Sequence, residues 1–286
     1  MKFSMYANFP ELLHSEGIEK AAAYAKSLGF SSVEMLEFIY KEKPECVKSV
    51  EDAKYIRKVL TSHGLSVSCY SVAVGLYEEG MTADTVTRAE KKLMQYADRA
   101  AALGSPFLHH TLTLGTPTEK LTVEETLEAI LPAAIRVATY AHSLGVTCIY
   151  EDQGPFFNGV EGFGRFFWAI KEACPYVGVC GDMGNTLFVD ESPVDFFRAY
   201  AEEIKHVHIK DYTLHTQRDE RHGWSVSTGG TWLRGAVIGQ GQIDLASCLA
   251  ELRRVGYNGI FSFENTHDVP FADGVRMGMD FLQKNA

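Results

Sequence analysis

Four side chains that can bind a metal ion, those of Glu151, Asp182, His208 and Glu264, lie in or at the end of short apolar, β-favouring runs. Runs of this kind are typical of buried strands. Three carboxylates and one imidazole make a hard, oxygen-rich ligand set. Such a set suits Mn²⁺, Mg²⁺ or Co²⁺ better than a structural zinc site, although Zn²⁺ is not excluded. The runs cover residues 147–151, 176–182, 206–210 and 259–264.

The elements that must position these residues follow a repeated helix–glycine–strand phrase. Its glycines are Gly29, Gly64, Gly104, Gly145 and Gly256, at intervals of 35, 40, 41 and 111 residues. A glycine just past a helix adopts the left-handed conformation without steric cost, and the next strand can then begin. The interval of 111 residues has room for two further strands, at 176–182 and 206–210. The helical segments before these two runs do not end in the glycine of the repeated phrase. With an opening strand at residues 2–9, the count is eight strands.

Strict alternation of strand and helix predicts a parallel sheet, and eight units predict a single (β/α)8 TIM barrel. A doubly wound sheet is the alternative topology, but no G-x-G-x-x-G phrase follows the first strand, so a dinucleotide site has no support. We found no linker, and we therefore expect one domain over residues 1–286. Thr122 and Glu125 predict a capping box at the start of a helix.

Active sites of such barrels lie at the carboxyl ends of the strands. Because side chains alternate along a strand, Val207 and Ile209 should face the helices, and His208 and Lys210 should face the barrel mouth. The same argument turns Glu151 and Glu264 inward. One strand-end carboxylate alone would more simply cap a helix or pair with a lysine, but four ligands on consecutive strands favour a metal site.

Composition limits the partners. A net charge of −10 argues against a nucleic-acid partner, and no stretch approaches the ~20 apolar residues that span a bilayer. The first residues lack the pattern of a signal peptide. The six cysteines form no C-x-x-C pair, and Cys69, Cys148 and Cys180 lie in apolar strand-like runs, where a reduced cysteine behaves as a small core residue. This favours a reducing compartment and a cytoplasmic protein. The oligomeric state is open, and a homo-oligomer is compatible with the sequence.

Five short phrases of the sequence stand out together. They are Phe30 to Glu34, Tyr150-Glu151-Asp152, Gly181 to Asn185, His206 to Asp211 and Phe261 to Asn265. These phrases resemble the sugar phosphate isomerase/epimerase family, the xylose isomerase-like barrels, which include ketose 3-epimerases, hydroxypyruvate isomerase and 2-keto-myo-inositol dehydratase. The resemblance implies that Glu151, Asp182, His208 and Glu264 bind one divalent ion, and that Glu151 and Glu264 also act as acid and base.

The implied chemistry begins with removal of a proton next to a metal-bound carbonyl, which gives an enediolate. Return of a proton makes an isomerase or epimerase of a small sugar, sugar phosphate or keto acid. Loss of hydroxide instead makes a dehydratase of the 2-keto-myo-inositol type. A DNA-repair endonuclease on the same barrel would need several zinc ions, extra histidines and a basic face. A sugar-binding protein without activity would not need all four ligands.

The chain departs from the ketose 3-epimerases in places that concern substrate binding. Asn185 stands where they carry a histidine, and the nearest Arg-Gly pair, at Arg234, lies beyond an insertion at residues 212–233. We expect Asn185, Lys210 and Arg234 to contact substrate, together with His110 rather than its neighbour His109. The insertion fits a lid or a solvated loop equally well. Gly239 and Gly241 fit a phosphate loop or a tight turn.

Overall fold

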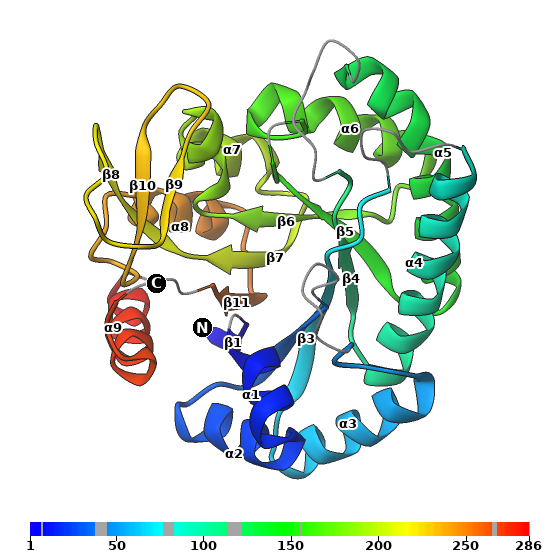
Figure 1. Cartoon of the computed structure of the whole chain (residues 1–286), viewed down its shortest axis with the longest axis horizontal. Helices are drawn as coiled ribbons and strands as arrows, with labels where there is room; N and C mark the ends of the chain where they lie inside the picture. Colours follow the sequence, from blue (N-terminus) through cyan, green and yellow to red (C-terminus); the bar gives the residue numbers. More distant parts are fainter. Residues whose placement is uncertain are drawn as a thin grey trace.

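The computed structural model describes residues 1–6, 8–37, 45–76, 83–113, 122–154, 156–264 and 268–285. Eight parallel strands form a closed barrel in the order β1-β11-β7-β6-β5-β4-β3-β2, and helices surround it (Figure 1). The predicted (β/α)8 TIM barrel is therefore confirmed. The barrel strands are β1 (Lys2–Met5), β2 (Ser32–Glu37), β3 (Ser66–Val72), β4 (Phe107–His110), β5 (Thr147–Glu151), β6 (Gly178–Asp182), β7 (Ile204–Ile209) and β11 (Ile260–Phe263).

The helices lie between the strands along the chain. All five glycines of the repeated phrase have φ between 67° and 92°, as predicted, and Thr122 and Glu125 form the predicted capping box at the start of α5. The helices are α1 (Phe9–Glu16), α2 (Ile18–Ser27), α3 (Val50–Ser62), α4 (Ala83–Leu103), α5 (Val123–Ser143), α6 (Gly159–Ala173), the short 3-10 helix η1 (Asn185–Val189), α7 (Pro193–Tyr200), α8 (Leu245–Arg254) and α9 (Phe271–Lys284).

The predicted first strand, residues 2–9, is too long. The strand ends at Met5, and α1 begins at Phe9 with Pro10 in its first turn. Proline fits this position because the first helical N–H groups have no partner within the helix, and its ring fixes φ near the helical value.

The main apolar core lies between the barrel and the helices. On β5, Tyr150 points outward and packs edge-on against Phe166 of α6, and both side chains are fully buried. The side chains that occupy the barrel interior are partly polar. Ser4 and Ser68 share a hydrogen bond of 2.7 Å there, and the buried Glu34, His206 and Ser262 occupy the same interior. The strand ends are therefore held from below by hydrogen bonds as well as by packing.

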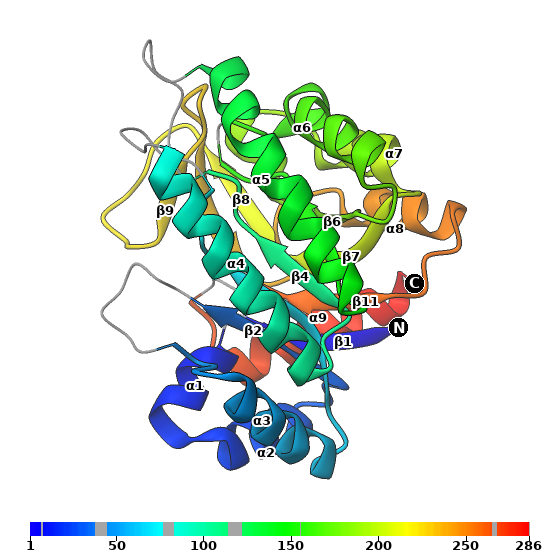
Figure 2. The ribbon, with the colours of Figure 1, turned by 90° about the vertical axis from the view of Figure 1, so that its right-hand side faces the viewer.

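The insertion at residues 212–233 contributes to a separate three-stranded antiparallel sheet, ordered β8-β10-β9. Figure 2 shows these strands on the left, at the end of the molecule away from both termini. The strands are β8 (Asp211–His215), β9 (Trp224–Val226) and β10 (Trp232–Ala236). Among the described helices none is both long enough and apolar enough to cross a membrane.

Candidate metal centre

Glu151, Asp182, His208 and Glu264 meet at the carboxyl ends of four neighbouring strands. Glu151 and Asp182 are the last residues of β5 and β6, His208 is the penultimate residue of β7, and Glu264 directly follows β11. One ligand atom from each residue lies within 4.8 Å of the other three. Barrel register brings them together, because Asp182 pairs with His208 and the N–H of Glu264 donates to the carbonyl of Ile209 at 3.0 Å.

The three carboxylates all lie near the Nδ1 atom of His208. It lies 2.6 Å from Glu151 Oε1, 3.7 Å from Glu264 Oε2 and 3.9 Å from Asp182 Oδ2. Asp182 and His208 are fully buried, and Glu264 is the most exposed of the four, at 28% of its side chain. Three carboxylates crowded in a buried place need positive charge between them. The donor set therefore fits a hard divalent cation.

Lys210 supplies part of that charge. Its Nζ lies 3.0 Å from Asp182 Oδ2, 3.0 Å from Glu264 Oε2 and 3.0 Å from Asn185 Oδ1. Burial alone would lower the pKa of Lys210, but Asp182 and Glu264 raise it well above its ordinary value, so the amine is charged. Asp182 is fixed from the other side, because the N–H groups of Gly184 and Asn185 donate to its Oδ1 at 2.7 and 2.8 Å.

A cavity of about 500 Å³ opens beside these residues. Glu264, Lys210 and Asn185 line it, so the structure brings two of the four predicted substrate contacts to the metal centre. The loop after β9 also contributes to the lining, with Ser227 and Thr228. The remaining lining residues are Gln153, Gly154, Phe188, Tyr212 and Val226.

The two histidines of β4 face opposite ways. His110 packs edge-on against Tyr150, 5.2 Å between ring centroids, and so lies in the layer between barrel and helices. His109 faces the barrel interior, where its Nε2 lies 3.7 Å from Glu151 Oε2. Burial lowers the pKa of both rings to about 4, so both are neutral near pH 7. The proposed substrate contact on this strand therefore moves from His110 to His109.

Arg234 lies in the three-stranded sheet, where it pairs with Asp268 and sits 5.8 Å from the ring of Trp224. Among the described residues it is not one of those that line the cavity. The structure therefore does not bring Arg234 together with the other predicted site residues, and a role in substrate binding stays a prediction.

The insertion is a fixed wall of the cavity in this structure. The Asp190 carboxylate, at the end of η1, accepts hydrogen bonds from Ser227 Oγ at 2.6 Å and from the N–H of Gly229 at 2.7 Å. These bonds tie the turn between β9 and β10 to the loop after β6. Of the two alternatives for the insertion, a cover over the site agrees better with this anchoring than a solvated loop does.

The two-glycine loop serves the turn and not a phosphate. The buried carboxylate of Asp211 accepts from the N–H groups of Gly239 at 3.0 Å, Gly241 at 2.8 Å and Ile243 at 3.2 Å. These amides point at a protein carboxylate, so they are not available to a phosphate group. Asp211 is thereby occupied, and Lys210 pairs with Asp182 and Glu264 instead.

Sequence reasoning assigned no role to Glu34, a fully buried residue of β2. Its carboxylate lies 2.9 Å from His208 Nε2 and 2.8 Å from His206 Nε2. Burial alone would raise the pKa of Glu34, but His208 and His206 lower it well below 4.5, so it is ionised. The available signal was an acidic residue inside an otherwise apolar strand, since strand interiors rarely hold a charge without a partner.

The structure is a TIM barrel with a group of four residues that could hold a metal ion at the carboxyl ends of its strands. The sequence profile of the family described as xylose isomerase-like TIM barrel matches residues 22–285. The chain belongs to this family. None of the curated protein sequences compared with the chain matches it significantly.

Solved structures with the same fold are distant in sequence. D-allulose 3-epimerase from Methylomonas sp. is 16% identical, with a TM-score of 0.74 over 100% of this chain and 98% of that chain. The 3-keto-D-glucoside 4-epimerase from E. coli is 15% identical, with a TM-score of 0.74 over 99% of each chain. The probable 3-DHS dehydratase from Bacillus anthracis is 14% identical, with a TM-score of 0.74 over 99% of each chain. At this identity the likeness establishes the fold alone.

Proposed function

We propose that the protein is a divalent-metal-dependent isomerase or epimerase of a small sugar, sugar phosphate or keto acid. The observation that carries the proposal is the convergence of Glu151, Asp182, His208 and Glu264 within 4.8 Å at the active end of the barrel. The adjoining cavity, about 500 Å³, has the size of a small-molecule site. The two epimerases with the same fold agree with this proposal.

The four ligands would hold one Mn²⁺, Mg²⁺ or Co²⁺ ion, with Zn²⁺ as a further option. Bound there, the ion supplies Lewis-acid chemistry, which polarises a substrate carbonyl and acidifies the neighbouring C–H group. Glu151 and Glu264 are then the proton-transfer residues. They come from β5 and β11, on either side of β6 and β7 in the barrel, which supports access to the substrate from two sides.

The remaining residues bind and orient the substrate. The charged Nζ of Lys210 and the amide of Asn185 lie 3.0 Å apart at the cavity wall and can hold substrate oxygens that gain negative charge. Phe188 and Tyr212 supply apolar surface to the same cavity. Ser227 and Thr228 add hydroxyl groups to the cavity lining.

A metal-dependent dehydratase is the second candidate. His109 favours it, because this neutral ring lies beside Glu151 and offers a second base there, so proton removal and protonation of the departing hydroxyl group can fall to different residues. A dehydratase is also among the proteins with the same fold. A DNA-repair endonuclease has less support, since the net charge is −10 and a basic face is required for DNA binding.

The experiment is incubation of the Mn²⁺-loaded protein in D₂O with a panel of ketoses, inososes and keto acids. Deuterium incorporation at carbon without loss of water supports an isomerase or epimerase. Loss of water with formation of a conjugated ketone supports the dehydratase. No exchange and no dehydration across the panel would contradict both.

Variants separate the chemistry from general damage to the fold. Glu264→Gln should abolish carbon-bound deuterium incorporation. Glu203→Gln, which alters a half-buried ion pair with Lys171 elsewhere on the molecule, should leave it unchanged. Normal exchange by Glu264→Gln would remove this residue from the mechanism.

A further inference from the structure

A single buried carboxylate, that of Glu34, joins four hydrogen bonds below the metal centre. Oε1 lies 2.5 Å from Ser71 Oγ and 2.9 Å from His208 Nε2. Oε2 lies 2.8 Å from His206 Nε2 and 2.5 Å from Ser262 Oγ. The partners come from β3, β7 and β11, so one side chain of β2 ties together the inner faces of three other strands.

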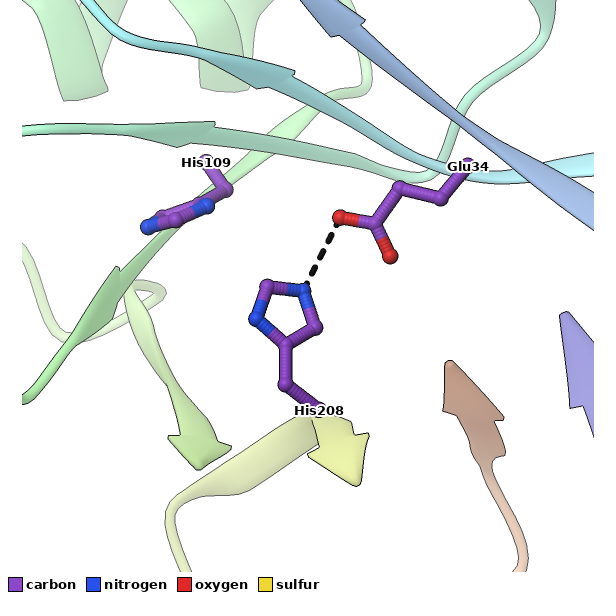
Figure 3. A group of neighbouring side chains, drawn as sticks. All are labelled: Glu34, His109 and His208. Carbon is purple, nitrogen blue, oxygen red and sulfur yellow. Dashed lines mark hydrogen bonds and ion pairs between the residues drawn. The ribbon is translucent and has the colours of Figure 1, made fainter. Parts of the chain in front are cut away.

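The hydrogen bonds define which nitrogen of His208 carries a proton. An ionised carboxylate only accepts, so every partner of Glu34 must donate. Nε2 of His208 therefore carries a proton, and in the neutral ring that binds a metal ion Nδ1 is the nitrogen with the lone pair. Without an ion, a second proton on Nδ1 occupies the hydrogen bond of 2.6 Å to Glu151 Oε1. Figure 3 shows the His208 ring with the bonded nitrogen directed at Glu34. Nδ1 is the atom that faces Glu151, Asp182 and Glu264.

The same carboxylate acts on His109 through Ser71. The Ser71 hydroxyl donates its hydrogen to Glu34, so its oxygen must accept from His109 Nδ1, at 3.2 Å. The lone pair of His109 is then on Nε2, the atom 3.7 Å from Glu151 Oε2. When both rings are neutral, each thus turns its unprotonated nitrogen toward the candidate metal centre.

A second metal ion at Glu34 is the competing interpretation. By distance alone, Glu34 with His109 and His208, or with Cys69 and His206, could hold one. However, both oxygens of Glu34 already accept two short hydrogen bonds each. A cation there would have to displace these four donors in a fully buried space, so the geometry favours a carboxylate that accepts hydrogen bonds and does not bind metal.

We propose that Glu34 is a positioning residue of the metal centre, which holds His208 with Nδ1 free for the ion and, through Ser71, holds His109 with Nε2 facing Glu151. This inference rests on the proposed metal-dependent function. Carboxylates that accept the second N–H of a ligand histidine fix its orientation and strengthen it as a ligand. Glu34 takes this part from the opposite side of the barrel.

Glu34→Gln tests the proposal because it keeps the shape and removes two acceptor positions. The new NH₂ group must face one of the two histidine N–H groups, and that ring must move its proton or lose its bond. Metal affinity should fall by about 10- to 100-fold. The matched control is Glu37→Gln. Glu37 is also buried on β2, but it accepts from Cys46 N–H, Val47 N–H and Tyr70 Oη, outside the metal centre.

Titration calorimetry with Mn²⁺ compares the metal-free native protein with both variants, and circular dichroism checks that each is folded. The proposal predicts weaker binding in Glu34→Gln and native binding in Glu37→Gln. Equal affinity in the native protein and Glu34→Gln, or an equal loss in both variants, overturns it while the proposed function stands. A native protein that binds no metal overturns both.

A measurement on the native protein covers the case in which Glu34→Gln does not fold. Nitrogen-15 NMR of the imidazole rings, before and after addition of diamagnetic Mg²⁺, identifies the protonated nitrogen of each histidine. The proposal requires a proton on Nε2 of His208 and on Nδ1 of His109. A proton on Nδ1 of His208 in the neutral ring would overturn it. Metal binding with these tautomers but without turnover of any carbohydrate would contradict the proposed reaction alone.

Discussion

Replacement of Lys210 by methionine tests the electrostatics of the site most directly. The ammonium lies 3.0 Å from one oxygen each of Asp182 and Glu264. At an effective dielectric constant of about 20, each contact corresponds to roughly 5.5 kcal/mol of gross attraction. Desolvation cancels much of this, and loss of one partner from a buried pair costs about 3–5 kcal/mol. We expect Lys210→Met to lower the free energy of unfolding of the metal-free protein by that amount.

The loss of stability in Lys210→Met should depend on whether a metal ion is bound. A divalent ion neutralises the same carboxylates, so Lys210→Met should recover most of its stability when Mg²⁺ or Mn²⁺ is added. It should also bind the ion more tightly than the native protein, because the ammonium no longer competes for Asp182 and Glu264. Turnover should nevertheless fall, since the group proposed to hold the charged substrate oxygen is gone.

The assay is urea denaturation followed by tryptophan fluorescence, in EDTA and in excess metal. Lys171→Met is the control. Its ion pair with Glu203 is half-buried at 2.7 Å and lies outside the site, so it should cost about 1 kcal/mol or less, with or without metal. An equal loss of stability for Lys210→Met in EDTA and in metal would refute the reasoning.

Three further outcomes are expected. Mn²⁺ at 100 times its Kd should stabilise the native protein by about 2.7 kcal/mol, which differential scanning fluorimetry would detect as a higher Tm. An unchanged Tm with Mn²⁺, Mg²⁺ and Co²⁺ would contradict the proposed metal site. Phe166→Ala should lower the free energy of unfolding by about 3–5 kcal/mol, because the fully buried ring packs on Tyr150 and Phe157; a loss below about 1 kcal/mol in urea denaturation would contradict this packing. The hydrogen bond from Ser227, with that from Gly229, lowers the pKa of Asp190 below 3.8. A carboxyl group with a lowered pKa in the folded state stabilises the protein above its unfolded pKa and loses that contribution as the pH falls through its folded pKa. The stability difference between the native protein and Asp190→Asn should therefore be full at pH 6 and shrink as the pH falls below 3.8, in urea denaturation across pH; a constant difference would contradict it.

The sequence predicted the barrel because its signals are local. A glycine after each of five helices and an apolar run after each glycine are visible within a few residues. The two strands without the glycine were found from the spacing alone, at β6 and β7. The first strand was predicted too long because Phe9 continues its apolar pattern, and only the helix around Pro10 ends it. The prediction of one domain over residues 1–286 stays a prediction.

Alternation along a strand predicted which side chains share a face, and it located the four ligand candidates. It favoured His110 over His109 as the residue that faces the interior, whereas the structure turns His109 inward, because the strand is short and its register cannot be read from one sequence. His109 pairs with Ile149, which faces the barrel interior beside Cys69 and Cys180. Glu34 was missed for a related reason. Its partners are 37, 172, 174 and 228 residues away, so no local pattern could indicate them.

The antiparallel ladder between β8 and β10 has a consequence for how this protein could diversify. Asp211 and Ala236 are register partners, so the 24 residues between them leave the barrel and return to it at adjacent points. The length and composition of that excursion can change without altering the spacing of the strands that carry the ligand candidates. Part of the cavity wall, at Val226, Ser227 and Thr228, thus lies in a stretch of the chain separate from the four ligand candidates. Exchange of residues 212–235 between relatives should therefore change substrate selectivity, while the proposed reaction is retained.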